Sequence, residues 1–270
     1  MSSRRRAAGN DAPRSATAGR HAQAGAAQRA STQPPRRLDA IDAARGAALC
    51  AMIAYHCCFD LRHFGLLAAD FAHDPFWLGS RALILGTFMA LVGVSLVLSE
   101  RSGTGAAPFW RRLGVIAASA VAVSLGSLVV FPQSFITFGV LHCIVVATLI
   151  ARPLVAAPRL ALVLGVAMIG VGNLVSHPVF DAPALSFIGL RTSKPLAEDY
   201  VPLLPWAGVT LLGAAAAHWA LTPHATAALS RLRVPRVLAW MGRQSLAIYL
   251  VHQPLLFGAL WLATSTGVHR

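Results

Sequence analysis

The feature that most constrains this chain is a succession of long apolar runs that begins after Arg37. A helix needs about 20 predominantly apolar residues to cross the hydrocarbon core of a bilayer, and lipid offers no partner for a free backbone N–H or C=O group. Of the 270 residues, 56% are apolar and only 12% are charged, which excludes an ordinary soluble enzyme, a secreted disulfide scaffold and a disordered protein. We therefore predict an all-α fold, a polytopic transmembrane helix bundle. Its seven expected spans are residues 40–58, 76–98, 112–131, 136–151, 159–175, 203–221 and 244–264, and an eighth follows if part of 176–200 re-enters the membrane.

The basic residues predict the topology rather than a nucleic-acid partner. Residues 1–37 hold eight arginines and no apolar run, so we expect a disordered Arg-rich cytoplasmic tail before a transmembrane domain at 38–270. With the tail inside, 17 of the 23 basic residues fall on the cytoplasmic side and four on the other. This asymmetry follows the positive-inside rule and places the N-terminus in the cytoplasm.

Three ionisable residues of the first span share one helix face. Asp42 and Arg45 are three residues apart and can pair across one turn, and Met52 and His56 continue the same stripe towards the outer end. An ionisable group at membrane depth costs several kcal/mol unless it is paired, which makes each a candidate for function. The alternative is an ion pair that anchors the helix at the interface, with a histidine capping the far end.

The expected outer loop 59–75 and the start of the second span supply two further candidates. His73 lies close to Asp70 and Asp74, and a histidine beside carboxylates can act as a general base. Arg81 lies one turn into the second span, where it either clamps an anionic ligand group or extends to the surface.

The later spans carry polar side chains in apolar surroundings. His142 is either a hydrogen-bonded packing residue or part of a site. Tyr249 and His252 share a face of the last span, beside Pro254, which frees a backbone carbonyl. This pattern favours a water-containing cavity, and the alternative is a proline kink satisfied by neighbouring helices.

Four motifs in order resemble one family. Residues 37–46 contain an Asp-x-x-Arg-Gly sequence and run on to His56; Phe138–His142 reads FGVLH; Asp199–Trp206 reads DYVPLLPW; and 242–254 reads GRQSLAIYLVHQP. Together they resemble the bacterial branch of the heparan-alpha-glucosaminide N-acetyltransferase catalytic-domain family over about residues 36–262.

The resemblance implies acetyl transfer across a bacterial inner (cytoplasmic) membrane. Acetyl-CoA would be the co-substrate, bound from the cytoplasm, and an amino sugar or sugar hydroxyl of an extracytoplasmic glycan or glycolipid would be the acceptor, with no metal expected. The family's catalytic histidine lies in the outer loop shortly before a Trp, which implies His73 before Trp77, and His56 competes for the role. The resemblance also implies that substrate or co-substrate is bound by residues of the motifs and spans described above, namely Asp42, Arg45, Arg81, His142, Asp199, Tyr249 and His252.

Two other classes of function stay open at this point. His56, His142 and His252 lie in spans, and paired histidines can ligate haem in an electron carrier. Counting residues from the ends of the spans places His56 and His142 near the outer side and His252 nearer the inner side, so their depths do not match. A small-molecule permease could use the same buried polar groups, although the chain has no internal repeat. The pattern does not fix whether the chain forms homo-oligomers.

Overall fold

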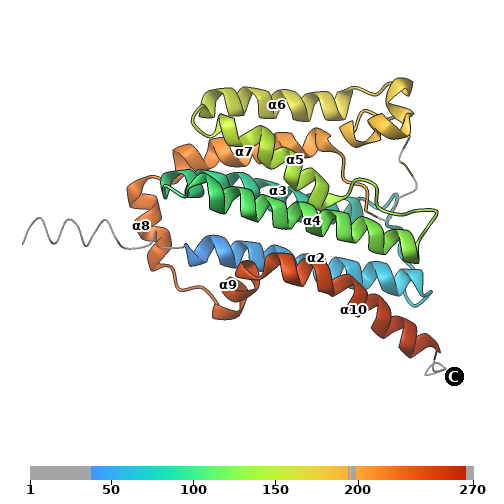
Figure 1. Cartoon of the computed structure of the whole chain (residues 1–270). Helices are drawn as coiled ribbons and strands as arrows, with labels where there is room; N and C mark the ends of the chain where they lie inside the picture. The colour runs from blue at the N-terminus through green and yellow to red at the C-terminus, as the bar shows by residue number, and fades with distance from the viewer. Residues whose placement is uncertain (1–37, 194, 196–198, 266–270) are drawn as a thin grey trace, which may run out of the picture. The chain divides into compact units, whose positions relative to one another are not determined.

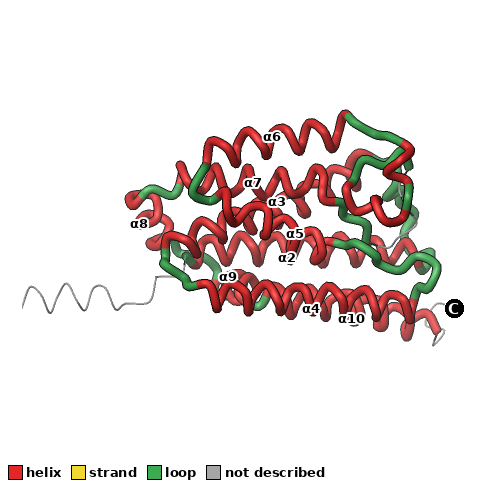
Figure 2. Tube along the Cα trace, turned by 45° about the horizontal axis from the view of Figure 1, so that its top comes forward, coloured by secondary structure: helices red, strands yellow, loops and turns green. Residues whose placement is uncertain are grey.

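The computed structural model describes residues 38–193, 195 and 199–265, and in this part of the chain every regular element is helical. The predicted all-α class is therefore confirmed. The long helices α2 (Asp39–His63), α3 (Pro75–Arg101), α4 (Ala106–Val130), α6 (Pro158–Leu174), α7 (Leu203–Ala220) and α10 (Ser245–Ser265) run side by side along one direction (Figures 1 and 2). The predicted disordered tail lies outside the described residues.

Each of the seven predicted spans corresponds to a helix, and four of these helices are long and apolar enough to cross a membrane. Within the described residues these four are α3, α4, α7 and α10. Helix α5 (Val140–Ala151), which is followed by the short 3₁₀ helix η1 (Arg152–Leu154), and helix α6 are apolar but shorter. Helix α2 is long but carries the charged residues of the first motif. The described part of 176–200 contains two short 3₁₀ helices, η2 (Pro178–Asp181) and η3 (Pro183–Ile188), and no helix of spanning length.

Prolines and short polar side chains set where several helices begin. Asp74 accepts a hydrogen bond from the backbone N–H of Phe76, and Pro75 occupies the first turn of α3, where its missing N–H costs nothing. The same arrangement starts α8 (Pro223–Arg231), where the Thr222 hydroxyl caps the helix in front of Pro223.

Helix α7 lies between α3 and α6 and owes that position to its small residues (Figure 1). A side chain at Gly213 would meet the backbone oxygen of Ala90 in α3, and one at Gly208 would meet Gly165 of α6. Small residues let membrane helices approach until their backbones touch. Helices α3 and α7 are thus in close contact at Gly213.

The outward surface of the bundle is apolar. Side chains of α3, α4, α6 and α10 are largely uncovered, with Val129 84% and Leu174 86% exposed. A soluble protein rarely exposes so many large apolar side chains, whereas lipid covers them without cost. Together with the spanning helices, this surface indicates a membrane protein.

Helix α2 is packed by α3, by α10 and by α9 (Arg236–Arg243), a short helix that sequence analysis did not anticipate. Gly242 of α9 sits directly on the Asp42 backbone, and Leu238 sits on Gly46. The first turns of α2 therefore face the C-terminal part of the chain, which brings the first and last motifs together.

Candidate functional site

A pair of histidines from α2 and α10 forms the centre of the candidate site. The Nδ1 atom of His56 lies 2.8 Å from the Nε2 atom of His252, and the two rings stack with their centroids 5.0 Å apart. His252 is buried and His56 is partly buried. The prediction that these histidines lie at different depths is therefore wrong. The prediction counted residues from the start of the last span, whereas α9 precedes α10 and packs on the first turns of α2, so His252 lies further from the start of this helical segment than the count assumed.

The hydrogen bonds fix which nitrogen of each ring carries a proton. Nδ1 of His252 lies 2.7 Å from the backbone carbonyl of Tyr249, which only accepts, so Nδ1 must donate. In the neutral ring Nε2 of His252 is then an acceptor, and Nδ1 of His56 must donate to it. Nε2 of His56 is left with a lone pair, and it has no hydrogen-bonding partner among the described residues. A lone pair held in this way can take a proton or attack a carbonyl carbon.

Asp199 joins the histidine pair to the start of α5. Its Oδ2 atom accepts from the backbone N–H of Val140 at 3.2 Å and from the hydroxyl of Tyr249 at 3.3 Å. Tyr249 lies one turn before His252 on α10, and their rings are 5.7 Å apart. Three of the predicted residues, Asp199, Tyr249 and His252, are thus brought together with His56.

Arg81 is held near this group by a backbone contact. One guanidinium nitrogen donates to the carbonyl oxygen of Tyr200 at 2.9 Å, which ties α3 to the segment that precedes α7. The Tyr200 hydroxyl in turn donates to the carbonyl of Ser186 at 2.6 Å, and burial raises the pKa of this tyrosine. Arg81 thereby joins the N-terminal part of α3 to the segment that carries Asp199 and Tyr200.

His142 is engaged at both ring nitrogens. Its Nδ1 atom accepts from the backbone N–H of Gly139 at 3.3 Å, so Nε2 carries the proton and faces the Ser124 oxygen at 3.5 Å. The Ser124 hydroxyl donates to the carbonyl of Ile136. With no free lone pair, His142 has the hydrogen bonding of a packing residue.

His73 makes no hydrogen bond, ion pair or ring contact with the paired histidines in the described part of the chain. Its side chain is 86% exposed, and its ring pairs with Asp70 at 2.9 Å in the loop before α3. The backbone N–H of Ala72 and then the His73 ring hold the pKa of the Asp70 carboxyl below its usual value. Of the two candidate bases, only His56 is joined to the other predicted residues in the described part of the chain.

Asp42 and Arg45 form a separate group at the other end of α2. The guanidinium of Arg45 donates to Asp42 at 2.8 Å, to Ser95 of α3 at 2.8 Å and to the carbonyl of Gly242 at 3.4 Å. Ser95 is not among the predicted site residues, because a serine in an apolar helix carries no signal of its own. Leu49 and Met52, both buried, separate this group from His56, so the stripe on α2 is not a continuous polar path.

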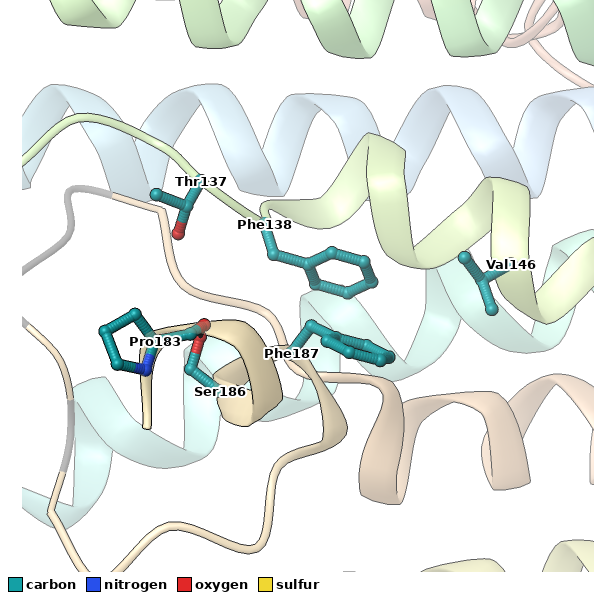
Figure 3. A pocket seen from close by; sticks show the side chains of 6 residues that line it. All are labelled: Thr137, Phe138, Val146, Pro183, Ser186 and Phe187. Atoms are coloured by element: carbon teal, nitrogen blue, oxygen red, sulfur yellow. Dashed lines mark hydrogen bonds between the residues drawn. The ribbon is translucent and has the colours of Figure 1, made fainter. Parts of the chain in front are cut away.

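An open hollow of about 340 Å³ lies beside the site and contains none of the predicted residues. Figure 3 shows Phe138 and Phe187 side by side in it, with Thr137 and Ser186 supplying hydroxyl groups. The Phe138 ring also contacts His142, with centroids 5.6 Å apart. The sequence predicts a water-containing cavity around α10, but none of the residues that line this hollow belongs to α10.

A comparison of the sequence with models of protein families identifies the family of this chain. The family model described as heparan-alpha-glucosaminide N-acetyltransferase, catalytic, matches residues 37–254. The chain belongs to this family. The match begins just before the Asp-x-x-Arg-Gly motif and ends at Pro254, directly after His252 and Gln253, so it spans both halves of the histidine pair. The searches of curated proteins and of solved structures found no match.

Membership in the heparan-alpha-glucosaminide N-acetyltransferase catalytic family confirms the resemblance seen in the motifs. It indicates a membrane acyltransferase, in agreement with the apolar surface and the spanning helices. The match covers the whole of α2 and the part of α10 up to Pro254, so both paired histidines lie within it.

Proposed function

We propose that this protein transfers an acetyl group from acetyl-CoA to an amino or hydroxyl group of a sugar in an extracytoplasmic glycan or glycolipid, with His56 as the reacting base. Family membership supports the class of reaction. The observation that carries the residue assignment is the lone pair on Nε2 of His56, held by the His252 contact at 2.8 Å.

The chemistry requires a base at the acceptor and a proton donor at the leaving group. As the acceptor nitrogen or oxygen attacks the thioester carbon, Nε2 of His56 takes its proton. The C–S bond then breaks and the same proton passes to the CoA sulfur, which leaves as a thiol. Bringing acceptor and thioester together supplies much of the rate, and the positioned base adds about 100- to 10,000-fold.

His252 gives His56 the correct proton arrangement and accommodates its charge. When His56 becomes an imidazolium, its Nδ1–H group still donates to Nε2 of His252, whose own orientation is fixed by the Tyr249 carbonyl. The same lone pair on His56 would also serve an acetyl-histidine intermediate, in which Nε2 attacks the thioester carbon and the thiolate leaves first.

The phosphates of acetyl-CoA need cations at the cytoplasmic end of the bundle. Arg45 is already engaged by three partners, whereas Arg231, Arg233 and Arg236 are exposed at the α8–α9 corner. We assign phosphate binding to this corner. The assignment places the N-terminus and the α8–α9 corner on the cytoplasmic side of the membrane, as the positive-inside pattern of seven spans predicts. Because Leu49 and Met52 are buried between the two ends of α2, the thioester does not reach His56 along the face of α2 that carries Arg45.

Vesicle reconstitution tests the proposal. Proteoliposomes loaded with acetyl-CoA are given radiolabelled glucosamine or a glucosamine glycolipid outside. We expect acetylated sugar outside and an equal amount of free CoA inside, with neither product in vesicles that hold His56→Ala protein. Acetyl-CoA that appears outside, with no acetylated sugar, would instead show a permease.

A haem-binding carrier is disfavoured by the histidine geometry. An iron ion between two imidazoles would separate nitrogens that here share a hydrogen bond. A Soret absorption band in protein purified from membranes would overturn this part of the proposal.

A further inference from the structure

A second polar pair joins α2 to α10 one turn from the histidines. Asp60 follows His56 by four residues on α2, and Gln253 follows His252 on α10. The side-chain amide of Gln253 donates from Nε2 to Oδ1 of Asp60 at 2.8 Å. The sequence predicts an outer loop from residue 59, but α2 continues to His63, so Asp60 lies on the helix and is only 1% exposed.

The two remaining oxygen atoms of this pair are buried without a partner. Oδ2 of Asp60 and Oε1 of Gln253 each expose less than 1 Å² and accept no hydrogen bond from the described residues. Asp60 also has no ion-pair partner in the described part of the chain, although His63 lies one turn further on α2. A buried carboxylate that lacks both a counter-charge and a full set of hydrogen bonds costs several kcal/mol.

Only a very small group can satisfy both oxygens. Since water does not reach either atom, a sugar hydroxyl, an ammonium group or a metal ion is too large to enter without moving the helices. A proton fits. On Oδ2 of Asp60 it turns an acceptor into a donor, and Oε1 of Gln253 is the acceptor that lacks a donor.

We propose that Asp60 is held as a neutral carboxylic acid that forms a two-hydrogen-bond pair with Gln253. In this pair Nε2 of Gln253 donates to Oδ1, and the Oδ2–H group donates to Oε1. The pair fixes the rotation and depth of α10 relative to α2, and so holds His252 against His56 one turn away. Asp60 is therefore a positioning residue, and its effect on acetyl transfer rests on the proposed function above.

Infrared spectroscopy tests the protonation state without any assay of activity. In reconstituted membranes at neutral pH, the spectrum of the wild type minus that of Asp60→Asn should contain the carbonyl stretch of a protonated carboxylic acid. Asp70→Asn is the matched control, because Asp70 is half exposed and paired, so its difference spectrum should contain carboxylate bands only. A carboxylate band in place of the acid band for Asp60 would overturn the proposal, whether or not the protein transfers acetyl groups.

The choice of substitution tests the positioning role. A side-chain amide at position 60 can donate to Oε1 and accept from Nε2 of Gln253, so Asp60→Asn should keep the rate of acetyl transfer within about threefold of wild type. Asp60→Ala leaves the Gln253 amide unpaired and lets the histidines move apart, which should lower kcat on the order of 100-fold with little change in KM. If Asp60→Asn were as slow as Asp60→Ala, the ionised carboxylate would be the working form and the proposal would be wrong.

Discussion

The Nδ1 atom of His56 lies 2.8 Å from the Nε2 atom of His252, across 196 positions of sequence. Because the Tyr249 carbonyl fixes the proton of His252, this one contact also fixes the proton of His56. It therefore decides which nitrogen can take part in acetyl transfer.

Removing the partner histidine should impair His56 without removing it. In His252→Ala, the Nδ1–H group of His56 loses its acceptor and the ring is free to rotate. We expect kcat for acetyl transfer to fall on the order of 100-fold, with little change in the KM of acetyl-CoA. Steady-state kinetics on purified protein measures both.

His63→Ala is the matched control for this variant, because His63 is an exposed histidine at the end of the same helix. Its kinetics should equal those of the wild type. An unchanged kcat in His252→Ala would show that the histidine pair has no part in catalysis.

Arg45 should prove to be a structural residue rather than a phosphate ligand. Lysine cannot reproduce the three hydrogen bonds that the guanidinium makes to α2, α3 and α9. Arg45→Lys should lower the free energy of unfolding by about 2 kcal/mol and leave the KM of acetyl-CoA unchanged. Thermal unfolding in detergent and kinetics give the two readouts.

Arg243→Lys provides the comparison, because the Arg243–Asp39 pair is largely exposed and should matter little. A raised KM in Arg45→Lys together with unchanged thermal stability would contradict the structural role and restore Arg45 as a co-substrate ligand.

The close approach of α3 and α7 should tolerate no extra methyl group. A Cβ atom at Gly93 would overlap the backbone oxygen of Thr210 and lie 2.6 Å from the Ala214 nitrogen. Gly93→Ala should therefore cost about 1–3 kcal/mol in unfolding free energy. Gly114→Ala in α4 meets nothing within 4 Å and should be neutral or slightly stabilising. Equal thermal stability of the two variants would show that the helices do not touch at Gly93.

The sequence alone predicts a helix at each of seven places where the structure has one, because the length and composition of an apolar run are local properties. It predicts no helix between the last two spans, where the structure has α8 and α9. Helix α9 is stable through its packing on α2, where Gly242 contacts Asp42, and a contact across about 200 residues leaves no local signal.

The same reason limits prediction of the site. Periodicity showed that Tyr249 and His252 share a face of one helix, and that Asp42 and His56 share a face of another. It could not show that the two faces meet, or that Leu49 and Met52 close the space between Arg45 and His56. The pairing of Asp60 with Gln253 was hidden because the first helix was expected to end before Asp60.

The segment between α6 and α7 should loosen in acid. The Thr192 hydroxyl donates to Asp181 at 2.5 Å and, with the Thr192 backbone N–H, holds the pKa of that carboxyl below its usual value. A lowered pKa in the folded state means that the stabilisation is complete above about pH 4 and is lost as the pH falls through the folded value. Protection of the Thr192 amide from hydrogen exchange, corrected for intrinsic rates, should decline over that range.

In Asp181→Asn the Thr192 amide should be less protected from exchange at neutral pH, and its protection should no longer change as the pH is lowered. A wild-type protein whose Thr192 protection stays constant from about pH 5 to about pH 2 would contradict the role given to Asp181.

The most direct measurement is the rate of acetyl transfer by His56→Ala and His73→Ala, assayed side by side in the loaded proteoliposomes. The structure joins His56 to His252 and leaves the His73 side chain 86% exposed with Asp70. We predict a loss of about 100-fold or more for His56→Ala and a rate within about twofold of wild type for His73→Ala. A fully active His56→Ala protein, above all beside an inactive His73→Ala protein, would contradict the account and return the catalytic role to the loop.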